Sequence, residues 1–203
     1  MIGPIDAKAG RDALALAAAV FVTAAVSILL TRDHTEISAV WAANAIVVAA
    51  LLHSDRRRWA LLVIAGYLAN GAANLAAGNG WVIAVFCSAA NVVEILICGW
   101  MLAPGFVGRF DRPRPSRISR VLLAALVGSV CSAAIATLVL WLYKGASPQE
   151  LFLSWLIADG LGLLIFVPAM AVLLGGTVAE ALRGSLPPCA RRCSGWPSPP
   201  RWR

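Results

Sequence analysis

Residues 52–77 read LHSDRRRWALLVIAGYLANGAANLAA, and this stretch contains the pattern that decides the fold. Three consecutive arginines stand directly before an apolar run of about 20 residues, which is the length of a helix that crosses the hydrocarbon core of a bilayer. The same alternation of connector and apolar run extends along the chain. The apolar runs occupy residues 13–30, 37–52, 59–77, 81–102, 121–143 and 151–174.

The composition agrees with a membrane protein. Hydrophobic residues make up 60% of the chain and charged residues 13%, with a mean hydropathy of +0.80, whereas about a quarter of the residues in a soluble domain are charged. The runs lack the period-two alternation of barrel strands, and a bilayer core leaves backbone groups no water to bind. The sequence therefore predicts an all-α, polytopic transmembrane helical bundle of about six spans, of which 37–52 is short.

The basic residues predict the orientation of these spans. Two precede the first run, three follow the second, five follow the fourth and five lie in the tail, while only Arg32 and Lys144 fall on the alternate connectors. Basic residues are enriched in cytoplasmic loops of membrane proteins. Both termini are therefore expected in the cytoplasm, and the chain in the inner membrane of a bacterium.

Three parts follow from this pattern: a cytoplasmic N-terminal segment (1–12), a transmembrane bundle (13–174) and a cytoplasmic tail (175–203). The tail is rich in Pro and Arg without helical or strand periodicity, which predicts disorder. Two interpretations of the tail stay open, namely a native segment and the product of a shifted reading frame.

The composition also excludes several classes of protein. The net charge of +7 resides in connectors, which favours contact with lipid headgroups and argues against nucleic-acid binding. The two histidines, His34 and His53, are expected on opposite sides of the membrane, and the five cysteines suggest no disulfide framework. Catalytic motifs are absent from the sequence, so we expect no catalytic residue, metal or cofactor, and not an enzyme.

Two carboxyl side chains lie inside predicted spans. An ionisable group within a span is costly and is a functional candidate by default. Glu94 follows Asn91 by three residues, so both share one helix face, and Asp159 lies in the sixth run. Asn44 and Asn70 are further polar residues in spans. Two roles stay open for these side chains: hydrogen bonding that fixes helix packing, and a site for a ligand, an ion or a proton.

The sixth run also contains Pro168, with Gly160 and Gly162 one or two turns before it. Proline removes a backbone hydrogen bond and kinks a helix. A flexible element and a static kink are both consistent with this spacing.

Several of these pieces together resemble the type-one membrane-associated sensor domain, or MASE family, over residues 13–174. The matching pieces, in chain order, are Trp41, Arg56-Arg57-Arg58-Trp59, Asn70, Asn91-Val92-Val93-Glu94, Asp159-Gly160-Leu161-Gly162 and Pro168.

This resemblance implies a signal-input module that regulates a cytoplasmic histidine kinase or diguanylate cyclase, in two-component or cyclic-di-GMP signalling. The chain departs from the family pattern in lacking the proline that often follows Trp41, and in lacking about two further spans and an output domain, so a truncated chain is expected. The candidate ligand-binding or signalling residues are Trp41, Asn44, Asn70, Asn91, Glu94, Asp159, Gly162 and Pro168.

The leading hypothesis is thus a sensory membrane domain without its output domain. The expected partners are the bilayer, an unidentified small ligand, a kinase or cyclase acting in trans, and a second copy of the chain in a homodimer. The alternative is a small transporter or channel subunit that uses Glu94 and Asp159, and a non-functional fragment is a third hypothesis.

Overall fold

The computed structural model describes residues 7–31, 40–105 and 115–174, and every regular element in these ranges is a helix. The predicted all-α membrane bundle is confirmed. The predicted tail, 175–203, lies outside the described residues. The elements are α1 (Ala7–Thr31), α2 (Ala43–Leu52), the 3-10 turn η1 (Arg56–Arg58), α3 (Trp59–Ala76), the π-helical segment η2 (Ile83–Cys87), α4 (Ser88–Leu102), the 3-10 turn η3 (Ala103–Gly105), α5 (Pro115–Lys144) and α6 (Pro148–Leu174).

Five helices of the described ranges are long and apolar enough to cross a membrane. They match five of the six predicted runs, and their segments are Ala7–Leu30, Arg56–Ala76, Ile83–Leu102, Ile118–Lys144 and Pro148–Ala171. The remaining run forms α2, which has 10 residues. A helix of that length extends about 15 Å, roughly half the thickness of the hydrocarbon core.

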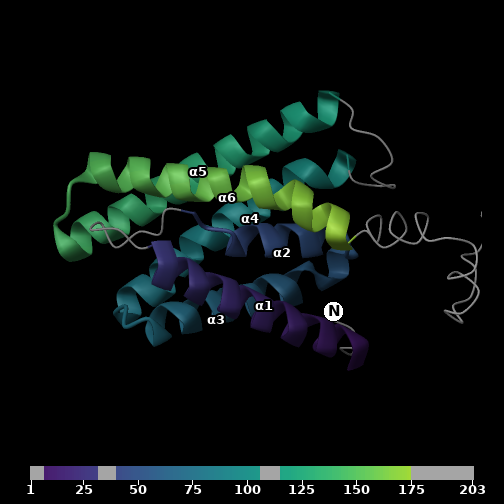
Figure 1. Ribbon diagram of the computed structural model, residues 1–203, viewed down its shortest axis with the longest axis horizontal. Coiled ribbons are helices and arrows are strands. Elements are labelled where there is room, and N and C mark those ends of the chain that lie inside the picture. The colour runs from purple at the N-terminus through teal and green to yellow at the C-terminus, as the bar shows by residue number, and fades with distance from the viewer. Residues whose placement is uncertain (1–6, 32–39, 106–114, 175–203) are drawn as a thin grey trace, which may run out of the picture.

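Helix α2 lies in the middle of the bundle. It packs against α1, α3, α4 and α6, and Figure 1 shows it between the α1–α3 pair and the α5–α6 pair. A helix that is apolar all round is typical of such a buried position. The buried side chains of α2 are Ala43, Asn44, Ala45, Val47, Val48, Ala49 and Leu51.

The segment before α2 is not helical at residues 40–42, so the prediction of a helix from residue 37 is wrong at these positions. The Trp41 N–H donates a hydrogen bond to the Ala158 carbonyl of α6, at 3.1 Å. Trp41 itself is 9% exposed. Irregular backbone at membrane depth is tolerated where protein buries it and supplies its hydrogen bonds, and α6 does both here.

Basic residues at the starts of α1 and α3 lie at one end of the bundle. Arg58 forms an ion pair with Asp12 at 3.5 Å, which joins the start of α3 to the start of α1. In Figure 1 the starts of α1, α3 and α5 and the ends of α2, α4 and α6 lie at this end. At the opposite end, a β-carbon added at Gly80 would lie 3.0 Å from the Tyr143 hydroxyl. The helices therefore alternate in direction along the chain.

The fourth predicted run, 81–102, contains the π-helical segment η2 near its start. It packs against α3, where a β-carbon added at Gly71 would lie 3.3 Å from the Ala84 carbonyl oxygen. A π-helical turn widens the backbone and often accompanies functional sites. Here the π-helical turn packs closely against α3 and directly precedes α4, which carries Asn91 and Glu94.

Candidate functional site

Glu94 is fully buried at the centre of the bundle, on α4. Its Oε1 atom accepts a hydrogen bond from the Ser129 hydroxyl of α5, at 2.9 Å. Its Oε2 atom accepts another from the Asn44 side-chain amide of α2. One carboxyl group thus binds two neighbouring helices, and both of its oxygens are satisfied, as a buried polar group requires.

Asp159 lies on α6 and is 3% exposed. Its Oδ2 atom accepts a hydrogen bond from the Ser132 hydroxyl of α5, at 3.3 Å. The Ser132 oxygen in turn accepts a hydrogen bond from Trp155 Nε1, at 3.0 Å. Trp155 and Asp159 are four residues apart and so share one face of α6, and Ser132 bridges them from α5.

The Glu94 and Asp159 carboxyl groups lie close enough to interact with each other. The two clusters therefore form one carboxyl network, made of Asn44, Glu94, Ser129, Ser132, Trp155 and Asp159 from α2, α4, α5 and α6. Because an ionised carboxylate only accepts hydrogen bonds, a hydrogen bond between the two carboxyl groups would need a proton on one of them. Such a network could hold or exchange a proton, or bind a small polar group by rearrangement.

Close approach of the helices makes this network compact. A β-carbon added at Gly128 of α5 would lie 2.9 Å from Cys98 Sγ and 3.2 Å from Glu94 Cγ. Glycine at this position therefore lets α5 approach α4 closely, as small residues do at helix interfaces in membranes. Cys98 also donates a hydrogen bond to the Ala124 carbonyl of α5, at 3.3 Å.

Trp41 and Gly162 lie next to the network through backbone contacts. The Trp41 N–H is hydrogen-bonded to the carbonyl of Ala158, the residue before Asp159. The Trp41 backbone also packs directly against Gly162. Among the predicted site residues, Asn44 and Glu94 are thus joined by a hydrogen bond and Asp159 is linked to them through the serines of α5, with Trp41 and Gly162 packed beside Asp159.

The other predicted residues lie elsewhere. Asn70 forms a local cluster at the end of α3, where Asn74 Nδ2 donates to its Oδ1 and carbonyl oxygens, at 3.1 Å each. Asn79 Nδ2 extends this cluster to Asn74 Oδ1, at 2.7 Å. Pro168 lies inside α6, nine residues past Asp159. These amide hydrogen bonds lie within α3 and the turn that follows it, so they do not join α3 to another helix.

Asn91 shares the buried face of α4 with Glu94, as predicted from their spacing, and is 3% exposed. However, its Oδ1 atom has no hydrogen-bond partner in the described structure, and neither do Ser88 Oγ and Trp41 Nε1. Buried polar atoms without a partner are rare in native proteins. They are points where a rearranged bundle could form new hydrogen bonds.

Sequence reasoning missed Ser129, Ser132 and Trp155. The two serines are three residues apart in an apolar run, which places them on one helix face, and this spacing is the signal that could have identified them. Trp155 carries a weaker signal, because tryptophan in a span is usually attributed to the membrane interface.

The comparisons with known proteins concern the same segment. A family model described as MASE1 matches residues 13–180, which include all the residues of the carboxyl network. Curated proteins and solved structures gave no significant match. Among the described residues, no group of three or more His, Cys, Asp or Glu could hold a metal ion.

Proposed function

Because the chain belongs to the MASE1 family of membrane sensory domains, we propose that it acts as a signal-input domain whose carboxyl network converts a cue into a change in helix packing. An integral membrane sensor needs an element with two arrangements that a cue can bias. The proposed element is the contact between Glu94 and Asp159, and its readout is α6, the last described helix.

The observation that supports this proposal best is the span of the network. Its hydrogen bonds join α2, α4, α5 and α6, so a change at either carboxyl group alters several helix interfaces at once. Buried polar networks of this kind have few partly satisfied states, because each lost hydrogen bond in a low dielectric is costly. This favours discrete rearrangements over gradual deformation.

The proposed output is a histidine kinase or diguanylate cyclase that acts in trans from the cytoplasmic side of the inner membrane, with both chain ends on that side. The family match supports a sensory role, and the alternation of helix directions supports placing both ends together. In this proposal the chain itself carries no catalytic residue.

Copurification from native membranes tests the proposal. The tagged chain should retain a kinase or cyclase, and Asp159→Asn should change the autophosphorylation or cyclic-di-GMP synthesis of the retained complex. Leu161→Ala is the matched control, because Leu161 lies on the same helix and is exposed toward lipid. A complex whose output is the same for the wild-type chain and Asp159→Asn would contradict the role of the network.

One observation favours the alternative of a transporter or channel subunit, namely that the two intramembrane carboxyl groups interact with each other rather than lie far apart. Proton relays in pumps and transporters use such groups. Proton flux into proteoliposomes that is lost with Glu94→Gln would support this second candidate. The absence of proton flux into proteoliposomes that contain the folded protein would count against it.

A further inference from the structure

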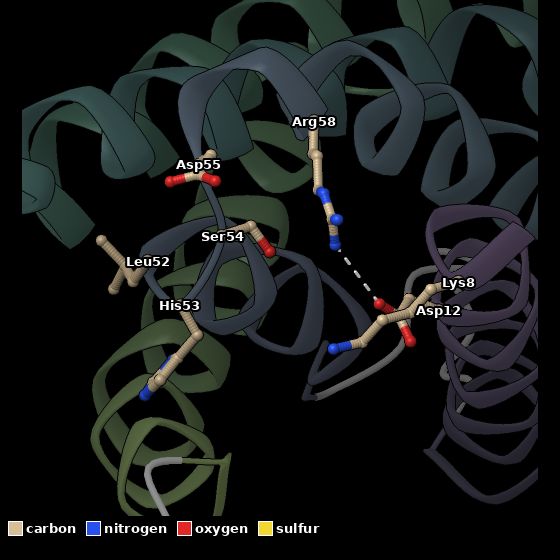
Figure 2. Close-up of a pocket in the computed structure, with 7 residues that line it drawn as sticks. All are labelled: Lys8, Asp12, Leu52, His53, Ser54, Asp55 and Arg58. Carbon is tan, nitrogen blue, oxygen red and sulfur yellow. Dashed lines mark ion pairs between the residues drawn. The ribbon is translucent and has the colours of Figure 1, made fainter. Parts of the chain in front are cut away.

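A polar cavity of about 480 Å³ opens at the basic end of the bundle, away from the carboxyl network. Figure 2 shows Lys8 and Asp12 of α1 facing the turn between α2 and α3, from which Arg58 reaches toward Asp12. The residues that line it are Lys8, Asp12, Leu52, His53, Ser54, Asp55 and Arg58.

This polar cavity continues into an apolar one. A second cavity of about 430 Å³ shares Asp12, His53 and Ser54 with the first. From there it follows α1 past alanine side chains, with Ile46 of α2 and Leu62 of α3 on its other side. From Asp12 to Ala19 the α1 axis rises about 10 Å, so the apolar limb extends well beyond the polar mouth.

The mouth lies where the apolar spans begin. Asp12 directly precedes the first apolar run, and Arg58 directly precedes the third. Next to the mouth, Trp59 Nε1 donates to the Leu51 carbonyl, at 3.0 Å, and the Arg56 guanidinium lies 4.9 Å from the Trp59 ring centre. Tryptophan and arginine in this arrangement are typical of the boundary between water and lipid. The groove therefore runs from a headgroup depth into an acyl-chain depth.

The charges of the mouth are of both signs. Lys8 and Asp12 lie on α1, and Asp55 and Arg58 lie on the turn across the mouth, so each side carries one cation and one carboxylate. The Arg58–Asp12 pair is exposed, with 37% and 52% of the side-chain surfaces accessible, so it contributes little and can be exchanged for another partner. The Asp55 carboxylate makes no ion pair with another described residue. A mouth with two cations and two carboxylates complements a headgroup that carries both a phosphate and an amine.

We propose that this groove binds a phospholipid with a phosphoethanolamine headgroup. Arg58 and Lys8 bind the phosphate, for which the guanidinium fork is well suited. Asp55 accepts hydrogen bonds from the primary ammonium group, and one acyl chain lies along Ala15, Ala19 and Ile46. A choline headgroup offers Asp55 no N–H donor, and a glycerol headgroup brings no positive charge.

Native mass spectrometry of the full chain, released from detergent and titrated with phospholipids of matched acyl chains, tests the proposal. The phosphoethanolamine lipid should bind more tightly than the phosphocholine and phosphoglycerol lipids. Asp55→Asn should remove most of this preference, and Arg58→Ala should weaken binding of all three lipids several-fold. Arg57→Ala is the control for Arg58→Ala, because Arg57 neighbours the site without lining it.

The apolar limb is tested separately. Ala19→Leu fills the limb and should weaken binding several-fold, whereas Ala18→Leu, one residue earlier and also exposed, should leave binding unchanged. Both variants should keep the wild-type helix content by circular dichroism. Equal binding of all three lipids, or binding that is insensitive to Ala19→Leu, would mean that only annular lipid is present and would overturn the proposal. A preference for the phosphoglycerol lipid that persists in Asp55→Asn would overturn it equally.

Discussion

The backbone of Trp41 lies directly on Gly162, so that a β-carbon at position 162 would overlap the Trp41 carbonyl oxygen. The obstacle is backbone, which cannot rotate away as a flexible side chain can. The contact holds the irregular segment before α2 against α6, within one turn of Asp159. It therefore connects the position of α2 to the helix that we propose as the readout.

Gly162→Ala should lower the free energy of unfolding by about 2–3 kcal/mol, because overpacking forces the backbone to shift. Thermal unfolding in detergent measures the effect. Gly160→Ala is the matched control on the same helix, since its β-carbon would meet only the Ser129 hydroxyl, at an ordinary 3.7 Å. Equal stability of the two variants would contradict the close approach at Gly162.

Glu94→Ala should destabilise the bundle by about 2–4 kcal/mol. The substitution leaves the Asn44 amide and the Ser129 hydroxyl without their acceptor and also creates a cavity. Glu94→Gln keeps one acceptor oxygen and should cost less than half as much. Leu96→Ala, at a site 42% exposed on the same helix, should have a small effect. Denaturant titration in mixed micelles provides the ranking.

Removing each of two buried hydroxyl groups of α5 should have different effects on the free energy of unfolding. Ser132→Ala removes the acceptor of Trp155 and a donor to Asp159 and should cost about 1–2 kcal/mol. Thr137→Val removes a buried hydroxyl that has no partner in the described structure, and should be neutral or slightly stabilising. A stability loss for Thr137→Val as large as that for Ser132→Ala would show that Thr137 is bonded in the native membrane.

The proposed cytoplasmic location of both chain ends predicts opposite labelling of two engineered cysteines. An impermeant thiol reagent added to intact cells with a permeable outer membrane should modify Ser147→Cys and spare Arg57→Cys. After lysis, both positions should react. Peptide mapping separates these sites from the native cysteines. Modification of Arg57→Cys in intact cells would reverse the proposed orientation.

Much of the fold is predictable because it depends on features that can be read along the sequence alone. The length of an apolar run and the position of arginines require no knowledge of neighbouring helices, and five of the predicted spans correspond to helices of sufficient length. The start of α2 could not be predicted in this way. A helix surrounded by protein and a helix surrounded by lipid need the same apolar residues, so composition does not separate α2 from a true span. The π-helical turn at Ile83–Cys87 also has no sequence signature.

Three members of the carboxyl network, Asn44, Glu94 and Asp159, were predictable from the sequence, and the connections of the network were not. The cost of burying Glu94 and Asp159 identifies both as candidates from sequence alone. Their contact depends on the rotation of α4 and α6 around their axes, which tertiary packing decides. Ser132 was missed because a hydroxyl is tolerated almost anywhere in a membrane helix. Its role depends on its partners Asp159 and Trp155 on α6.

The hydrogen bond between Trp41 and Ala158 has a consequence for biosynthesis. The ribosome makes about a hundred residues after the Trp41 amide before its acceptor exists. Until α6 enters the bilayer, the Trp41 N–H lacks this acceptor. An unsatisfied N–H is costly in lipid, so the segment around Trp41 is more stable where water reaches it. We therefore expect the second apolar run to reach its final depth only after α6 has been inserted.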